Sequence, residues 1–251
     1  MSLKFSFTDD KFYLKRLNLP SRYYLFNDDE NYIKLLNIGE GIFPKDKIKT
    51  SFELDNSSLI LTTESATKIY PSNSKYSSKN YINITLKNSS NLEFLNDELI
   101  LYKEAKFVQP FRLKFDESST FFYTDILSNG RSYENFDFSY MKIKNRFYEN
   151  SSLEYIERFD IKGDELKDYI KRKESKTNLF AKIYIKTLDN EAFLNSLFSE
   201  DFKSFSYSKN KKIIIAVISC ENMAKLKEKV LKVWNFYRKN INKNEFSLGK
   251  Q

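Results

Sequence analysis

Hydrophobic and polar residues alternate over much of this chain, and a period of two is typical of β-strands with one buried face. The clearest stretches are "LKFSF" at 3–7, "YINITLK" at 81–87 and "FRLKF" at 111–115, where every second residue is Leu, Ile or Phe. The same reading predicts further strands at 22–26, 32–38, 47–54, 119–127, 136–148, 153–161, 179–187 and 211–219. The pattern therefore predicts a mainly β protein.

Asparagine, aspartate and serine supply most of the predicted turns, because the chain has only five glycines and four prolines. Asn and Asp tolerate the left-handed backbone region and bond to their own main chain. The turns are expected at "NDDEN", "LDNSS", "KNSSN" and "YENSS".

Helical periodicity is confined to the C-terminal part of the sequence. One stretch at about 221–241 carries apolar residues at helical spacing, and "DNEAFLNSLF" at 189–198 predicts a shorter helix. The basic segment 167–176 is interpreted as a solvated loop or a short helix. No linker, repeat or composition shift marks a boundary, so residues 1–251 are predicted to form one domain with a C-terminal helix.

One strand-like stretch changes character part of the way along. "LILTTESATKIYPSNS" at 59–74 begins with alternating Leu59 and Leu61, and then continues with hydroxyl and charged residues. Thr62, Thr63 and Thr67 are β-formers, yet a dry core would place apolar side chains here. We call these three threonines the polar seam.

Charge and composition limit the partners. The formal charge is +8 and the pI is about 9.2. However, the basic residues are spread along the chain among 34 acidic ones, which argues against a nucleic-acid partner. The sequence has no apolar run of the roughly 20 residues that cross a bilayer, and its start does not resemble a signal peptide. The single Cys220 allows no internal disulfide. A cytoplasmic protein without a membrane partner is expected.

The absence of histidine excludes several kinds of site. Triads with a histidine base, histidine-containing zinc sites and HExxH helices all need imidazole. One cysteine cannot form a thiolate cage. A metal held by this chain alone would depend on carboxylates, carbonyls, hydroxyls and water, which bind late transition metals weakly. No P-loop or GxGxxG motif is present.

Three segments in order resemble the urease accessory proteins called UreD or UreH. They are "LTTESATKIY", "LEFLNDELILYKEAKFVQ" and "NGRSY", against family segments of the form TTQ-A-TK-Y, LE-LPD-I-F-A and GR. The closing "IIIAVIS" and the helix after it also resemble the family, so the likeness spans roughly 30 to 240. The matching positions are Thr62, Thr63, Ala66, Thr67, Lys68, Tyr70, Leu92, Glu93, Leu95, Asp97, Ile100, Ala105, Gly130 and Arg131.

Departures from the family pattern indicate a divergent member. The glycine-rich loop GG-V-GGD has its counterpart in "NIGEGIFPKDK", which keeps Gly39, Gly41 and Asp46. Asn96 replaces the proline before the central aspartate, and Asp125 replaces the usual glutamate ahead of the GR segment.

The resemblance implies a fold and a function. The fold is a β-helix-like body of stacked sheets with one or two helices near the C-terminus. The function is that of a non-enzymatic maturation factor that binds apo-urease and UreF, which recruits the GTPase UreG. Nickel is then cargo in transit through a water-filled interior, and no cofactor is tightly bound. A polar seam would keep that interior wet, which lowers the desolvation cost for a cation. Weak oxygen ligands also suit a passage better than a store.

Candidate site residues follow from this interpretation. Glu64, Asp97 and Asp125 are the expected transient cation contacts along a route bordered by the polar seam. Because cations repel Ni²⁺, Lys68 and Arg131 are expected to pair with carboxylates, Arg131 by bidentate bonding.

Four other positions are assigned by type. Tyr70 and Gly130 are structural motif positions, and Gly130 is expected in a turn with positive φ. Trp234 and Tyr237 belong to the stripe of the C-terminal helix, where they serve as core residues or as contacts for a partner.

Two alternatives remain open at this point. A β-solenoid binding module for carbohydrate or a protein partner would show a row of exposed aromatic side chains along one face. A glycoside hydrolase would need two carboxylates facing one bond. Asp97 and Glu98 are adjacent on a predicted strand and should point to opposite faces, so Asp125 would have to be the second group.

Overall fold

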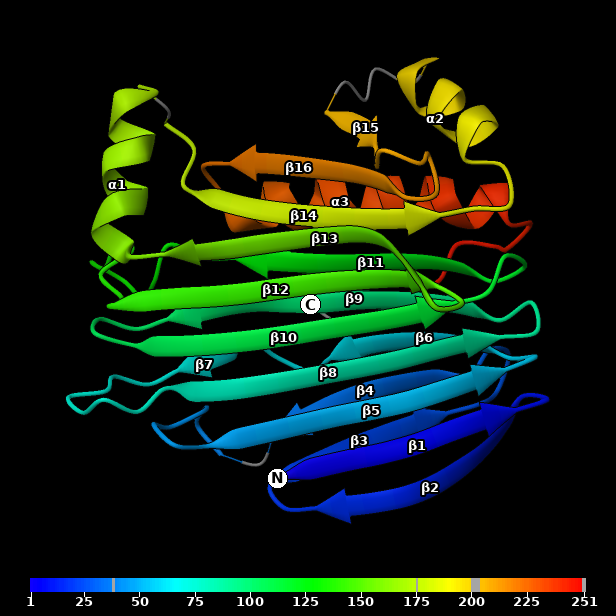
Figure 1. Cartoon of the computed structure of the whole chain (residues 1–251), viewed down its shortest axis with the longest axis horizontal. Coiled ribbons are helices and arrows are strands. Elements are labelled where there is room, and N and C mark those ends of the chain that lie inside the picture. Colours follow the sequence, from blue (N-terminus) through cyan, green and yellow to red (C-terminus); the bar gives the residue numbers. More distant parts are fainter. Residues whose placement is uncertain (38, 175, 200–203, 250–251) are drawn as a thin grey trace.

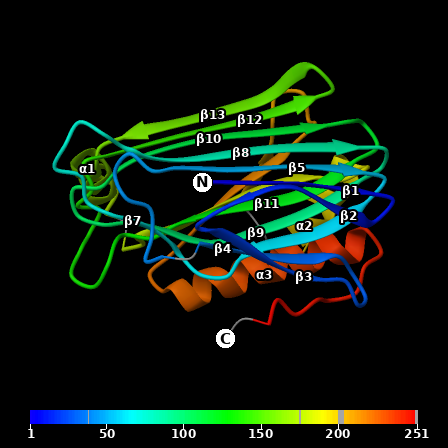
Figure 2. The same ribbon diagram turned by 90° about the horizontal axis from the view of Figure 1, so that it is seen from below.

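Two β-sheets packed face to face form most of the computed structural model, which describes residues 1–37, 39–174, 176–199 and 204–249 (Figure 1, Figure 2). Within these ranges, sheet A has the strand order β13 (Ser152–Ile161), β12 (Tyr140–Glu149), β10 (Lys106–Phe115), β8 (Ser78–Lys87), β5 (Lys47–Asp55), β1 (Ser2–Thr8) and β2 (Lys11–Asn18). Sheet B has the order β15 (Phe205–Tyr207), β16 (Ile214–Cys220), β14 (Leu179–Lys186), β11 (Thr120–Leu127), β9 (Asn91–Leu101), β6 (Ser58–Thr63), β4 (Tyr32–Asn37) and β3 (Ser21–Phe26). The short β7 (Thr67–Ile69) pairs with β9.

The chain winds between the sheets as a solenoid does. From β4 to β12 successive long strands alternate between sheet B and sheet A, and neighbours within each sheet run parallel. Antiparallel hairpins close the ends of the winding, as in β1 with β2 and β12 with β13. This arrangement confirms the predicted mainly β, β-helix-like stack. Residue 38, where one predicted strand was to end, lies outside the described residues.

The inward residues of both sheets make a core rich in aromatic rings. Phe5 stacks on Phe52 at 4.9 Å between ring centroids, and Phe111 of sheet A stacks on Tyr123 of sheet B at 4.2 Å. The outward residues of sheet A are mostly charged or polar, which explains why its strands keep a strict alternation in the sequence.

Three helices are found in the described ranges: α1 (Gly163–Arg172), α2 (Asn190–Ser199) and α3 (Met223–Asn240). The two helices predicted near the C-terminus are present as α2 and α3. Asn222 caps α3, because its side chain accepts hydrogen bonds from the backbone nitrogens of Ala224 and Lys225. Figure 2 shows α3 lying along the outer face of sheet B.

The segment interpreted as a loop or a short helix forms α1, and it begins earlier than predicted. Glu165 accepts a hydrogen bond from the backbone nitrogen of Lys162 at 2.9 Å, which secures the first turn. Gly163 packs so closely that a Cβ there would lie 1.9 Å from the carbonyl oxygen of Phe136. Within the described residues, no helix has the length and apolar character needed to span a membrane.

Candidate functional site

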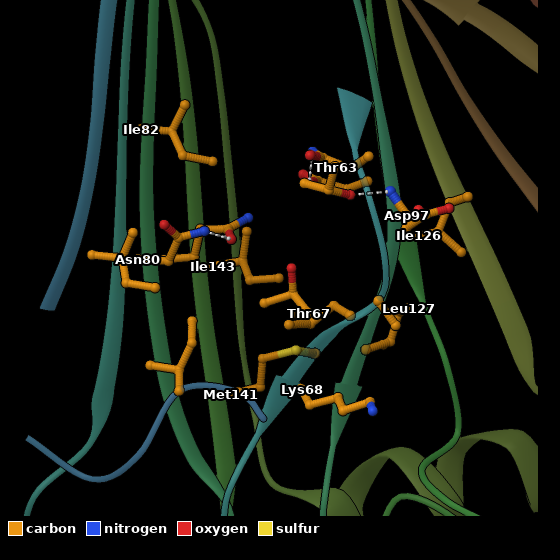
Figure 3. Close-up of a pocket in the computed structure, with 18 of the residues that line it drawn as sticks. Thr63, Thr67, Lys68, Asn80, Ile82, Asp97, Ile126, Leu127, Met141 and Ile143 are labelled. Carbon is orange, nitrogen blue, oxygen red and sulfur yellow. Dashed lines mark hydrogen bonds between the residues drawn. The ribbon is translucent and has the colours of Figure 1, made fainter. Parts of the chain in front are cut away.

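A cavity of about 480 Å³ lies between the two sheets. Strands of both sheets line it, and Figure 3 shows Asn80, Ile82 and Ile143 from sheet A facing Thr63 and Leu127 from the other side. Its volume is in the range of small-molecule sites. The interior of the stack is therefore not filled by side chains along its whole length.

Asp125 is one of three acidic residues in the cavity lining, with Glu40 and Asp97, and it joins the two sheets. Its Oδ1 accepts hydrogen bonds from the Tyr123 hydroxyl at 2.6 Å and from Asn96 Nδ2 at 3.4 Å. Its Oδ2 accepts one from Asn145 Nδ2 at 3.2 Å. Because Asp125 is on β11 and Asn145 on β12, these bonds join the two sheets across the cavity wall.

The polar contacts continue from Asn145 to a second carboxylate. Asn145 Nδ2 donates to the Tyr184 hydroxyl at 3.0 Å, which in turn donates to Glu157 Oε2 at 2.5 Å. Lys182, another residue of the cavity lining, pairs with Glu157 Oε1 at 3.0 Å. Asn145 Oδ1 is buried and accepts no hydrogen bond from any described residue. This oxygen is therefore an unsatisfied buried acceptor in the wall of the cavity.

Burial is the largest influence on the pKa values of Asp125 and Tyr184. It raises the pKa of Asp125, although hydrogen bonds from Tyr123 and Asn145 act in the opposite direction. Burial, followed by the charge of Glu157, raises the pKa of Tyr184 well above its ordinary value. Burial and the charge of Asp125 likewise raise the pKa of Tyr123. Hence Tyr123 and Tyr184 stay protonated and act as hydrogen-bond donors near neutral pH.

Replacing Asp125 by asparagine tests the cost of the buried charge. A carboxyl whose folded pKa lies above the unfolded value of 3.8 favours the folded state most when protonated, so its ionisation lowers stability as pH rises through the folded pKa. We expect the Asp125→Asn variant to melt at or above the wild-type temperature at pH 7. This advantage should shrink as pH falls toward 3.8. Thermal melts across this pH range measure the difference, and a variant less stable than wild type at pH 7 would contradict it.

The cavity lining reaches exposed residues at two places. Gly39, Glu40 and Ser65 belong to loops before β5 and β7, and Tyr169 lies on α1, at the same end of the stack (Figure 1). The part below α1 is apolar, and its lining includes Met141, Ile143, Phe159, Ile161, Leu166 and Phe180. The polar middle is thus connected to an apolar end, and these two places are candidate openings.

A bulge in β9 sets the positions of the predicted central aspartate and its neighbours. The register with β11 shifts so that Asn96 and Asp97 together oppose Asp125. Asp97 and Glu98 consequently both contact Lys227 Nζ on α3, at 3.1 Å and 2.6 Å. The expected alternation of Asp97 and Glu98 was therefore wrong, because it assumed a regular strand. The Asp97 carboxylate contacts the helix outside sheet B, whereas Asp125 faces inward, so these two do not flank a common bond.

The three seam threonines divide between the two faces of sheet B. Thr63 and Thr67 line the cavity, and Thr63 Oγ1 accepts a hydrogen bond from the Asp97 nitrogen at 2.9 Å (Figure 3). Thr62 is buried outside the cavity lining and donates to the Leu95 carbonyl at 2.6 Å. Glu64 is exposed, is not part of the lining, and pairs with Lys34 at 3.4 Å. Of the three predicted route carboxylates, Asp97 and Asp125 belong to the cavity lining, and the Asp97 carboxylate is paired with Lys227.

The predicted motif positions are close to one opening. Arg131 donates from Nε and Nη2 to Glu134 Oε1, at 3.0 Å and 2.7 Å, and Gly130 has a φ of +128°. Lys68 lines the cavity and makes no ion pair with a described carboxylate. Tyr70 donates to Glu40 at 3.0 Å, and its ring is within 2.9 Å of where a Cβ on Gly41 would be. Gly41, at φ +158°, thus permits close packing of two loops.

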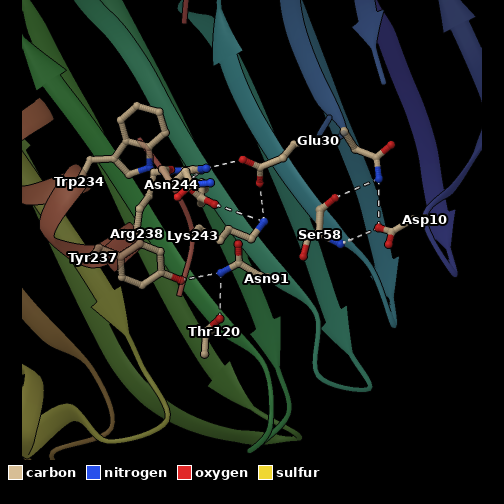
Figure 4. Close-up of polar contacts among 12 residues, drawn as sticks. Asp10, Glu30, Ser58, Asn91, Thr120, Trp234, Tyr237, Arg238, Lys243 and Asn244 are labelled. Atoms are coloured by element: carbon tan, nitrogen blue, oxygen red, sulfur yellow. Dashed lines mark hydrogen bonds and ion pairs between the residues drawn. The ribbon is translucent and has the colours of Figure 1, made fainter. Parts of the chain in front are cut away.

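The two aromatic residues considered as partner contacts lie inside the molecule (Figure 4). Trp234 and Tyr237 are each 0% exposed. Trp234 Nε1 donates to Glu93 at 2.6 Å, and Asn91 Nδ2 donates to the Tyr237 hydroxyl at 2.6 Å. The partner-contact interpretation is corrected accordingly, because the apolar stripe of α3 is used entirely to dock the helix on sheet B.

A buried ionic cluster surrounds Trp234 (Figure 4). Arg238, 0% exposed, donates from Nη1 to Glu93 at 2.6 Å and from Nη2 to Glu30. Lys243 donates to Glu30 at 2.6 Å. Burial raises the pKa of Glu93, and Arg238 acts against it. For Glu30, burial is outweighed by the hydrogen bonds from Lys243 and Arg238, so its pKa is lowered.

Sequence reasoning missed two parts of the site. Asn145 occupies the inward place between Ile143 and Phe147 in "MKIKNRF", so a polar residue at a core position was the available signal. Lys182 is the second part. Residues on both faces of β14 are buried or half-buried, so alternation of apolar and polar residues does not show that Lys182 points inward.

Other kinds of site find less support among the described residues. No group of three or more His, Cys, Asp or Glu is placed to hold a metal ion within them. The exposed aromatic rings are scattered over edge strands, loops and helices, as at Tyr24, Phe43, Tyr133 and Tyr169. They do not form the row along one face that a carbohydrate-binding solenoid would show.

Comparison with known proteins identifies relatives over nearly the whole chain. The family profile described as UreD urease accessory protein matches residues 17–248. A protein named urease accessory protein UreD from Aliarcobacter butzleri (strain RM4018) is 66% identical over 251 residues, which is 100% of both chains. Proteins of the same name from Staphylococcus epidermidis (strain ATCC 12228 / FDA PCI 1200) and Staphylococcus aureus (strain bovine RF122 / ET3-1) are 31% and 33% identical. These two matches cover 64% and 59% of this chain, and 59% and 54% of the relatives.

Proposed function

Because the chain belongs to the family of UreD urease accessory proteins, we propose that it is a urease maturation factor that binds apo-urease and routes nickel toward its active site. UreF-like and, through UreF, UreG-like proteins are the further partners in this proposal. The protein performs no catalytic step of its own, and nickel is its cargo.

The observation that carries the nickel route is the polar middle of the cavity between the sheets. Asp125 and Asn145 both belong to its lining, and the buried Asn145 Oδ1 accepts no hydrogen bond from the described residues. Oxygen donors without imidazole or thiolate hold Ni²⁺ weakly. A cation crossing such a cavity can exchange water for these oxygens and leave again, which a route requires.

Activation of urease in the presence and absence of this chain tests the function. Apo-urease is expected to gain full activity and nickel only when the chain is combined with UreF-like and UreG-like partners and Ni²⁺. The purified chain alone should hydrolyse no urea. Urease activity and nickel per active site are the measurements. Equal activation without the chain, when free nickel is limiting, would refute the proposal.

A further inference from the structure

The outer face of sheet A gathers basic side chains that are far apart in the sequence. No helix of the described chain covers this face (Figure 2). Outward positions on six of its strands carry them, and we call this set the basic face: Lys4, Arg16, Lys49, Arg112, Lys114, Lys142, Lys144, Arg146 and Arg158. The sequence shows these bases scattered, and the parallel stacking of strands brings them together.

Strand register places like charges directly opposite each other. Arg112 of β10 faces Arg146 of β12, and Lys144 of β12 faces Arg158 of β13. Neighbouring strands are about 4.8 Å apart, and like charges at directly opposite positions destabilise a sheet. The fold therefore accepts a cost here that an acidic partner would relieve.

Acidic residues on the same face neutralise little of this charge. Lys142 pairs with Asp160 at 2.8 Å, at the edge of the sheet. Within the described residues, Lys144, Arg146 and Arg158 have no ion pair, and partial desolvation together with Arg146 and Arg158 lowers the pKa of Lys144. The centre of the face thus stays positive.

The other side chains on this face favour a protein over a nucleic acid as the partner. Ile156 is 38% exposed and lies across from Arg146, and Leu153 is 45% exposed and lies across from Tyr148. The Arg112 guanidinium lies 5.6 Å from the ring centroid of Tyr148. Arginine and tyrosine around exposed aliphatic groups are the composition of protein interfaces, whereas phosphate contacts need no aliphatic centre.

We propose that the basic face of sheet A is a docking surface for an acidic surface on a protein partner, and that this partner is apo-urease. The identity of the partner rests on the proposed function, whereas the chemistry of the surface rests on the residues above. Docking here leaves α3 and the outer face of sheet B outside the contact.

Matched charge variants test the docking surface. The sheet variant carries Arg112→Gln, Arg146→Gln and Arg158→Gln, and the control carries Lys225→Gln, Lys229→Gln and Lys232→Gln on the exposed side of α3. Both lose three positive charges. Binding of each full-length chain to purified apo-urease is measured by biolayer interferometry at low and high ionic strength.

The sheet variant is expected to bind apo-urease at least about ten-fold more weakly than wild type, and its affinity should depend less on salt. The affinity of the control should stay within about two-fold of wild type. Because like-charge contacts are removed, its melting temperature should not fall. A lower melting temperature would show that the facing basic side chains do not destabilise sheet A. Wild-type affinity in the sheet variant would overturn the proposal. So would equal losses in both variants, which would indicate net charge alone.

Two further outcomes separate this proposal from others. A duplex DNA oligonucleotide that binds wild type but not the sheet variant, with apo-urease binding unchanged, would assign the face to nucleic acid and overturn the proposal. A wild-type chain that neither binds apo-urease nor supports its activation would refute the proposed function, and the docking partner with it.

Discussion

Replacing Arg238 by methionine is expected to lower the free energy of unfolding by about 3–5 kcal/mol, the usual cost of removing one partner from a buried ion pair. Methionine keeps most of the side-chain volume but leaves Glu93, 0% exposed, without its cation. Lys243 would remain 3.8 Å from Glu93, too far to replace the lost hydrogen bond. Urea denaturation followed by tryptophan fluorescence measures the change, since Trp234 contacts the same carboxylate.

Two controls separate the buried charge from general damage to α3. Lys239→Met changes the next residue, which is exposed, and should alter stability by less than about 0.5 kcal/mol. Combining Arg238→Met with Glu93→Gln should recover part of the loss, because the uncompensated charge is gone. A single variant as stable as wild type would show that the cluster contributes nothing to folding.

Replacing Asp125 by leucine is expected to reduce urease activation by about ten-fold, the size of effect that loss of a polar partner near a metal typically has. Leucine removes the inward carboxylate, adds apolar bulk to the polar part of the cavity lining and leaves the Tyr123 hydroxyl without its acceptor. Binding to partners should be unchanged, because Asp125 faces the interior. Activation assays with limiting nickel, together with pull-downs of the complex, measure both.

Glu64→Leu is the matched control for this second variant. It removes a carboxylate that the sequence also suggested for the route, but the structure places it outside the cavity lining in a pair with Lys34. Its activation should equal that of wild type. If Glu64→Leu lost activation and Asp125→Leu did not, nickel would not take the interior path.

The sequence predicted most of the long strands, because each inward face is buried against the other sheet, but β2 (Lys11–Asn18) and β9 (Asn91–Leu101) were not among the predicted ranges. Residues such as Phe111, Leu113 and Phe115 alternate with charged ones, so period two is visible without any tertiary information. The stacking of sheets came from the family resemblance, since parallel neighbours such as β8 and β10 lie too far apart in sequence for local patterns to pair them.

The sequence predicted which way a site residue points only where the strand alternates regularly between inward and outward side chains. Asp125 is inward because Tyr123 and Leu127 are, but the bulge in β9 moved Asp97 and Glu98 to one cation on α3. A bulge adds one residue to one strand and reverses the faces of those beyond it, and no pattern within "NDELIL" reveals it. The basic face was missed for the opposite reason: its residues look dispersed until register aligns them.

The docking of α3 also governs the order in which this molecule can be completed. Each new strand of the stack can pair with the strand before it in its sheet as the chain leaves the ribosome, because its backbone hydrogen bonds involve only neighbouring strands. Arg238, however, meets Glu93 from 145 positions away. Until the last part of the chain emerges, Ile60, Leu95 and Phe122 on the outer face of sheet B lack their helix. The nascent protein therefore exposes an apolar sheet face through most of its synthesis. Docking of α3 buries this face and removes a surface that could aggregate.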